Sequence, residues 1–228
     1  MIPHSEIYRY MGHRGTADGQ LEALVSSCLE KLSTASAPRH LVMPMPCTVS
    51  GDSVTIGELT TDSSAISTVT IKSSRLAEHL SGCIQVYILA ATLGAAVDRL
   101  ISQRGKIDSA ETLCLQACAA AQIEDYCNNA AEELSREVNG QGLYLRPRFS
   151  PGYGDFDIAF QTDILRILQA QKRIGVTETK SHMLTPLKSV TALIGVCQGG
   201  CPQKAIHESG KCADCAKTDC QFRVNQPL

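Results

Sequence analysis

Apolar residues recur three or four positions apart in several stretches of the chain, the spacing of an amphipathic helix. This pattern predicts helices over 18–34, 75–81, 95–104, 108–138 and 157–173, with a short helix or turn over 5–15. Asp108 followed by Glu111 has the spacing of a capping box, which marks a helix start. Gly175 is the expected stop of the last helix.

A period of two, or a short apolar run, marks the remaining ordered stretches. Residues 40–43 and 53–56 flank a Gly51-Asp52 turn, and 67–72 alternates in the same way, so these three read as antiparallel strands. The apolar runs 84–91 and 189–196 are predicted as buried strands, although periodicity alone does not separate the first from a buried helix. The pattern predicts an α+β fold: a mainly antiparallel sheet flanked by helices.

Composition excludes several classes of function. The 228 residues are 43% hydrophobic, enough for a full core, and their net charge is −2. A nucleic-acid-binding or polybasic membrane-binding protein would need a basic face. The amino terminus lacks the basic-then-apolar order of a signal peptide, and the most apolar run, 83–97, is shorter than the ~20 residues of a spanning helix. We expect a cytoplasmic protein without membrane or nucleic-acid partners.

The stretch Arg-Phe-Ser-Pro-Gly-Tyr-Gly-Asp (148–155) is the candidate binding loop. Pro151 favours an extended Ser150, whose N–H and C=O we expect to be available to a ligand. The glycines allow unusual dihedrals or close approach of a bound molecule. Arg148 offers a planar fork for a carboxylate, and Tyr153 a ring face with a hydroxyl. The competing interpretation is a plain turn that ends in an Asp that caps the next helix.

The flanking sequence adds a family resemblance. The stretch 148–155, the helix end Ile-Leu-Gln-Ala-Gln-Lys-Arg-Ile-Gly-Val (167–176) and the segment 177–196 together resemble the activation domain of cobalamin-dependent methionine synthase, in its small stand-alone form. The resemblance extends more weakly to 9–15 and 83–94, and it stops near Cys197. It implies a domain that binds S-adenosylmethionine and presents the methyl group to a reduced corrinoid.

The resemblance also assigns roles to residues. By motif position Arg148 holds the carboxylate of the ligand, the backbone of Ser150 meets the adenine, and Tyr153 sits near the methyl-transfer face. Pro151 and Gly152 complete the motif. An acid on the preceding helix lies near the amino end of the ligand in this family. Glu124 is the nearest match and Asp125 the neighbouring choice, while the competing interpretation is a solvated acid.

The corrinoid itself has to come from elsewhere. No Asp-x-His-x-x-Gly corrinoid motif is present, and the chain is too short for homocysteine, folate and corrinoid modules. Cobalamin is therefore expected on a partner methionine synthase or corrinoid methyltransferase subunit, with a flavodoxin or ferredoxin as electron donor. Methyl transfer from a sulfonium needs alignment and exclusion of water more than proton transfer, so the lack of an acid/base pair is consistent with this function.

The last 32 residues form a second unit in the prediction, with domains at 1–196 and 197–228. Five of the eleven cysteines lie there, in a Gly/Lys/Asp-rich context that could not fold well by apolar burial. Clustered thiolates in a cytosolic chain favour a metal over disulfides. The expected ligands of a small metal knuckle are Cys201, Cys212, Cys215 and Cys220, with Cys197 as the alternative. Spacing leaves zinc and an iron–sulfur cluster both open.

The sequence thus predicts an activation component that supports reductive methylation of a partner's cobalamin. Two other classes stay open. One is a redox or electron-transfer adaptor that uses the cysteine tail and does not bind a methyl donor. The other is an interaction module with a structural zinc.

Overall fold

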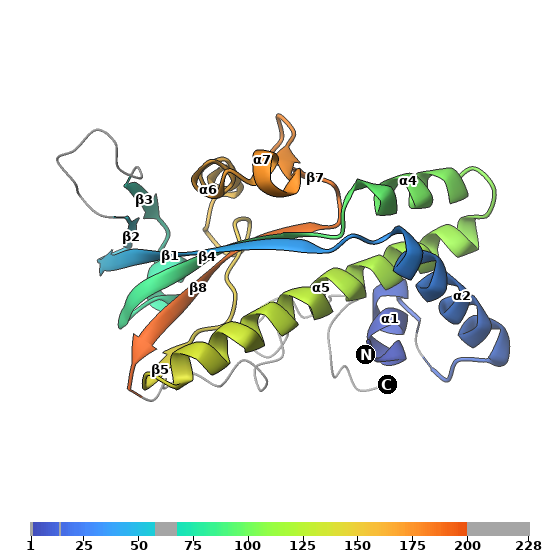
Figure 1. Ribbon diagram of the computed structural model, residues 1–228, viewed down its shortest axis with the longest axis horizontal. Helices are drawn as coiled ribbons and strands as arrows, with labels where there is room; N and C mark the ends of the chain where they lie inside the picture. Colours follow the sequence, from blue (N-terminus) through green and yellow to red (C-terminus); the bar gives the residue numbers. More distant parts are fainter. Residues whose placement is uncertain (1, 14, 58–67, 200–228) are drawn as a thin grey trace.

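The computed structural model describes residues 2–13, 15–57 and 68–199, and Figure 1 shows how their helices and strands are arranged. The expected α+β architecture is confirmed. A long helix, α5, crosses one face of the sheet, and two short helices, α6 and α7, cover the other. The cysteines expected to bind metal, 201–220, lie outside the described residues, as does Ser67 at the start of a predicted strand.

Within the described residues, six strands form one sheet in the order β3-β2-β1-β4-β8-β5, and every neighbouring pair is antiparallel. The bounds of these strands are β1 Arg39–Ser50, β2 Ser53–Ile56, β3 Val69–Lys72, β4 Cys83–Thr92, β5 Leu143–Leu145 and β8 Ser189–Gln198. A separate hairpin pairs β6 Thr177–Glu178 with β7 Leu184–Thr185. The central strands β4 and β8 are those predicted from the apolar runs.

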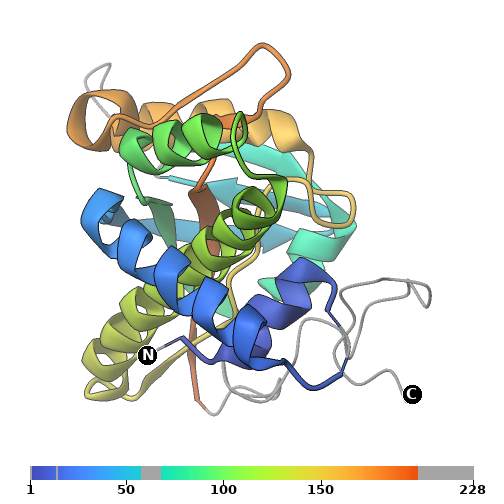
Figure 2. The same cartoon turned by 90° about the vertical axis from the view of Figure 1, so that its right-hand side faces the viewer.

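The helices divide between the two faces. Their bounds are α1 His4–Met11, α2 Gly19–Ala35, α3 Ser74–His79, α4 Ala95–Arg104, α5 Ser109–Asn139, η1 Ile158–Phe160, α6 Gln161–Leu168 and α7 Ala170–Ile174. The helices α1, α2 and α4 pack against α5, and Figure 2 shows α2 lying across it. The core therefore has two parts, one between α5 and the sheet and one between the sheet and α3, α6 and α7.

Helix α5 follows from its sequence. Asp108 caps it, because its carboxylate accepts hydrogen bonds from the N–H groups of Ala110 (2.9 Å) and Glu111 (3.0 Å). One seam of the helix is apolar, and its buried members are Leu115, Ala119, Ile123, Cys127 and Ala130. Small residues along this seam allow close approach to the sheet. In the described part of the chain, no helix has the length and apolar character needed to cross a membrane.

Strand β1 is longer than the predicted stretch 40–43, although it contains two prolines. Pro44 and Pro46 pair with β4 positions Tyr87 and Gln85. The Pro46 carbonyl accepts a hydrogen bond from the Gly57 N–H on the side away from β4 (3.0 Å). The proline nitrogens therefore face that outer side, and no hydrogen bond to β4 is lost.

The helix predicted over 157–173 is wrong as one element. It is broken into η1, α6 and α7, and Gln169 at the last break has a left-handed backbone with φ 50°. The break turns the chain so that α7 also faces the sheet, with Ala170 and Ile174 buried there. Packing against the sheet thus overrides helix continuity, and Gly175 ends α7 as predicted, with φ 72°.

Candidate functional site

The candidate loop begins as an extension of the sheet edge. After β5, the chain still follows β8, because Phe149 and Leu193 exchange two backbone hydrogen bonds of 2.9 and 2.8 Å. The register shifts on the way, because Phe149 lies four positions after Leu145, whereas their partners Val196 and Leu193 are three positions apart. The extra residue makes a bulge around Pro147. Bulges of this kind re-aim side chains and end strand pairing.

Arg148 leaves this bulge toward α5. Its Nη2 donates to Glu124 Oε2 (2.9 Å) and to Asn128 Oδ1 (2.8 Å), and its side chain is only 12% exposed. Glu124 and Asn128 are one helical turn apart, so they share a face of α5. Asp125, the alternative acid, instead accepts a long hydrogen bond from Asn129 (3.4 Å). The structure therefore brings together Arg148 and Glu124, two residues that lie 24 positions apart in the chain.

The segment Ser150 to Asp155 forms a tight turn. The carbonyl of Ser150 accepts a hydrogen bond from the Tyr153 N–H (3.2 Å), so the expectation that this carbonyl is available to a ligand is wrong. The Gly152 N–H donates to the carbonyl of Phe156 (2.7 Å). Gly152 and Gly154 have φ values of 91° and 57°, which L residues with side chains rarely adopt. Pro151 is buried beneath the turn.

Aromatic rings support the turn from the face opposite to α5. The Phe149 ring lies 4.9 Å from His79 and 6.2 Å from both Phe156 and Tyr153, measured between ring centroids. The outer ring, Tyr153, is 55% exposed, whereas Phe156 is fully buried. Successive residues of an extended strand point to opposite faces, which explains why Arg148 meets α5 and Phe149 meets these rings.

His79 ties the bulge to α3. Its Nε2 lies 2.8 Å from the Pro147 carbonyl, which only an Nε2–H can satisfy. Burial lowers the pKa of His79, and the charge of Arg146 lowers the pKa further, although the hydrogen bond to Pro147 acts in the opposite sense. A neutral ring that donates from Nε2 follows, and it fixes the backbone directly before Arg148.

Asp155 caps a helix, but a different one from the helix that follows it in sequence. Its carboxylate accepts hydrogen bonds from the Ser73 hydroxyl and from the N–H groups of Ser74 (2.7 Å) and Arg75 (3.1 Å), at the start of α3. These bonds, that of Ser73 first, hold the pKa of the Asp155 carboxyl below its usual value, against a smaller effect of burial. The interpretation of the segment as a turn that ends in a capping Asp is therefore confirmed, but the expectation that this Asp caps the next helix is wrong, because Asp157 caps η1.

Asn128, His79 and the Asp155 anchor were not predicted as parts of the site. Asn128 had a usable signal, because a residue four positions after Glu124 lies on the same helix face. His79 and the α3 partners of Asp155 are about 70 to 80 residues distant in sequence from the loop. Contacts of that separation are set by sheet topology and leave no local pattern.

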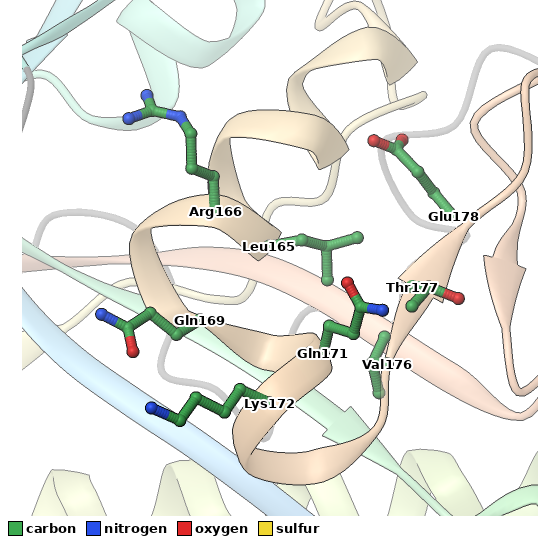
Figure 3. Close-up of a pocket in the computed structure, with 8 residues that line it drawn as sticks. All are labelled: Leu165, Arg166, Gln169, Gln171, Lys172, Val176, Thr177 and Glu178. Atoms are coloured by element: carbon green, nitrogen blue, oxygen red, sulfur yellow. The ribbon is translucent and has the colours of Figure 1, made fainter.

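A separate hollow of about 640 Å³ lies beside α6, α7 and β6. Figure 3 shows its lining, in which the side chains of Arg166, Gln169 and Lys172 point away from Thr177 on β6. Two of the charged groups in its lining are already engaged, Arg166 with Asp163 (2.9 Å) and Glu178 with His182 (2.9 Å). None of the predicted site residues lines this hollow, which makes it a weaker candidate than the loop.

Of the cysteines considered as metal ligands, only Cys197 lies in the described residues. It belongs to β8, is 4% exposed, and its thiol donates to the Tyr144 carbonyl (3.5 Å). Within the part of the chain that the structure describes, no three His, Cys, Asp or Glu side chains are grouped in a way that could hold a metal ion.

Comparisons with known proteins agree with the fold. No family model matches the chain, and a search of curated proteins gives no match. Among solved structures, the chain is similar to the crystal structure of the MetH reactivation domain bound to AdoHcy, with a TM-score of 0.60 and 17% sequence identity. The match covers 82% of this chain and 68% of that one. At this identity the likeness shows a shared fold.

Proposed function

We propose that the chain binds S-adenosylmethionine between the Arg148 loop and α5, and that it supports reductive methylation of cobalamin on a partner protein. The observation that carries the proposal is the convergence of Arg148 and Glu124 at 2.9 Å in this fold. These are the two residues that the family resemblance assigns to the carboxylate and amino end of the ligand. The similar structure with bound AdoHcy supports an adenosyl ligand for this fold.

Each loop residue has a role in this proposal. Arg148 binds the ligand's carboxylate and Glu124 its ammonium group, while the backbone at Ser150 meets the adenine. The N–H of Ser150 is the group proposed to meet the adenine. The N–H and C=O of Phe149 both point to β8, and the polar groups of the next residue in an extended chain point the opposite way. Pro151 and Gly152 shape the turn, and the exposed ring of Tyr153 borders the transferred methyl group.

The proposed chemistry needs one electron and no proton. An external donor of the flavodoxin or ferredoxin type, or a bound cluster, reduces Co(II) to Co(I). The Co(I) electron pair then attacks the methyl carbon, the carbon–sulfur bond breaks with its electron pair remaining on sulfur, and S-adenosylhomocysteine leaves. The protein's contribution is to align the sulfonium and keep water away. In this proposal half of the active site belongs to the partner methionine synthase or methyltransferase subunit.

The cysteine tail is part of the proposal in a separate role. Cys201, Cys212, Cys215 and Cys220 would bind zinc or an iron–sulfur cluster, and either metal suits four thiolates. The burial of Cys197 in β8 favours these four residues over a set that includes it. A redox adaptor without methyl-donor binding is the alternative function, and it relies on this tail alone.

The test is a methylation assay with a corrinoid protein. The cobalamin-binding portion of a methionine synthase, without its own reactivation domain, is held under a low-potential reductant with S-adenosylmethionine. Adding the chain should convert the Co(II) spectrum into that of methylcobalamin, and Tyr153→Ala should slow this conversion. An unchanged Co(II) spectrum in the presence of the wild-type chain would contradict the proposed function.

A further inference from the structure

The two groups on α5 that hold Arg148 differ in charge. Glu124 contributes a carboxylate and Asn128 a neutral amide, and both accept from the same nitrogen, Nη2. A guanidinium carries five N–H donors, so these two bonds leave the donors on Nε and Nη1. Among the described residues, Arg148 makes side-chain hydrogen bonds through Nη2, and none through Nε or Nη1.

Asn128 therefore positions Arg148 without neutralising it further. The cluster of Arg148, Glu124 and Asn128 carries one positive and one negative charge and sums to zero. An α-amino acid end, with one carboxylate and one ammonium group, has the matching arrangement. A second acid at position 128 would leave the cluster with a net negative charge, which repels a carboxylate and attracts an amine.

We propose that Asn128 is a specificity-determining residue that favours a methyl donor with a carboxylate over its decarboxylated analogue. The inference rests on the proposed function and concerns the same site. Specificity of this kind is a difference between two affinities, and it is often set by a group that would repel the wrong ligand. Asn128 is a neutral acceptor at a position where the similarly shaped side chain of Asp would also fit.

The test compares two ligands on four proteins by calorimetry. The ligands are S-adenosylmethionine and decarboxylated S-adenosylmethionine, which has an aminopropyl end. The proteins are the wild type, Asn128→Asp, Asn128→Ala and the control Asn129→Asp. The control adds the same charge at the next position of α5, where Asn129 bonds to Asp125 and not to Arg148.

The wild type should prefer S-adenosylmethionine. Asn128→Asp should lower the affinity for S-adenosylmethionine about tenfold, because the new carboxylate repels the carboxylate of the ligand. The same variant should bind the decarboxylated ligand as tightly as the wild type does, or more tightly. Asn128→Ala should weaken the binding of S-adenosylmethionine by about threefold, because one of the two acceptors that orient Arg148 is lost. Asn129→Asp should leave the ratio of the two affinities unchanged.

Two outcomes would overturn the inference while leaving the proposed function intact. One is an Asn128→Asp protein that binds S-adenosylmethionine as the wild type does. The other is an equal loss of affinity for both ligands in Asn128→Asp, which would indicate a structural effect of the substitution. A wild type that binds neither ligand refutes the proposed function and this inference with it. Melting temperatures of the four proteins show whether each variant is folded.

Discussion

Asp155 accepts a 2.7 Å hydrogen bond from the backbone N–H of Ser74, which lies 81 residues earlier in the chain. This bond joins the end of the candidate loop to the first turn of α3. The loop is consequently held at both ends, by Phe149 on β8 and by Asp155 on α3. A loop held in this way is pre-organised, and less conformational entropy is lost when it binds a ligand.

The Asp155 anchor should make stability depend on pH. Hydrogen bonds from Ser73, Ser74 and Arg75 lower the pKa of the carboxyl in the folded chain. The ionised form therefore stabilises the fold above the unfolded pKa of about 3.9, and this contribution is lost as the pH falls through the lower folded pKa. Asp155→Asn should melt at a lower temperature than the wild type at pH 7, with a gap that narrows below about pH 4. A gap independent of pH would contradict the role of the ionised carboxylate.

Gly195 should tolerate no larger residue. A Cβ at this position of β8 would lie 2.6 Å from Cys83 Sγ and 2.7 Å from Leu80 Cδ2, both closer than van der Waals contact. Gly195→Ala should lower the free energy of unfolding by about 1–3 kcal/mol, the range for overpacked cores. Urea unfolding measures this loss.

The matched control is Gly19→Ala at the first position of α2, where an added Cβ has no neighbour within 4 Å. Alanine should be neutral or slightly stabilising there, because it restricts the unfolded chain. Equal urea midpoints for the two variants would show that the space around Gly195 is not limiting.

The cysteine tail gives a prediction that does not depend on the methyl donor. Cys215→Ser removes one of the four proposed thiolate ligands, so metal content after anaerobic purification should fall to background. Near-ultraviolet circular dichroism of the variant should match the wild type if the main domain folds without the metal. Visible charge-transfer absorption in the wild type would indicate an iron–sulfur cluster, and a colourless protein with stoichiometric zinc a structural site. Metal content unchanged by the substitution would refute the ligand assignment.

Local patterns predicted most of the fold. The helical period, together with the cap at Asp108, predicted α5, and the apolar runs predicted β4 and β8. The break at Gln169 was not predicted, because it depends on how α7 meets the sheet. Strand β5 was missed for a similar reason, since its three residues are extended mainly by pairing with β8. Elements this short have little preference of their own.

Part of the candidate site was likewise predicted from the sequence, and part was not. The family resemblance selected Arg148, Tyr153 and Glu124, and the structure brings Glu124 to Arg148. The Ser150 carbonyl was assigned wrongly, because the preference of residues before proline says nothing of the i to i+3 bond that closes the turn. Asn128 was missed, although it lies one helical turn after Glu124 on the same face of α5.

Calorimetric titration with S-adenosylmethionine tests the central claim, that Arg148 holds the ligand, most directly. The wild type should bind, and Arg148→Ala should lose about 10- to 100-fold in affinity, the value of a charge-assisted hydrogen bond. Arg173→Ala, on α7 at the other face of the sheet, is the matched control and should bind as the wild type does. Equal affinity of the Arg148→Ala and wild-type proteins would contradict the site proposed here.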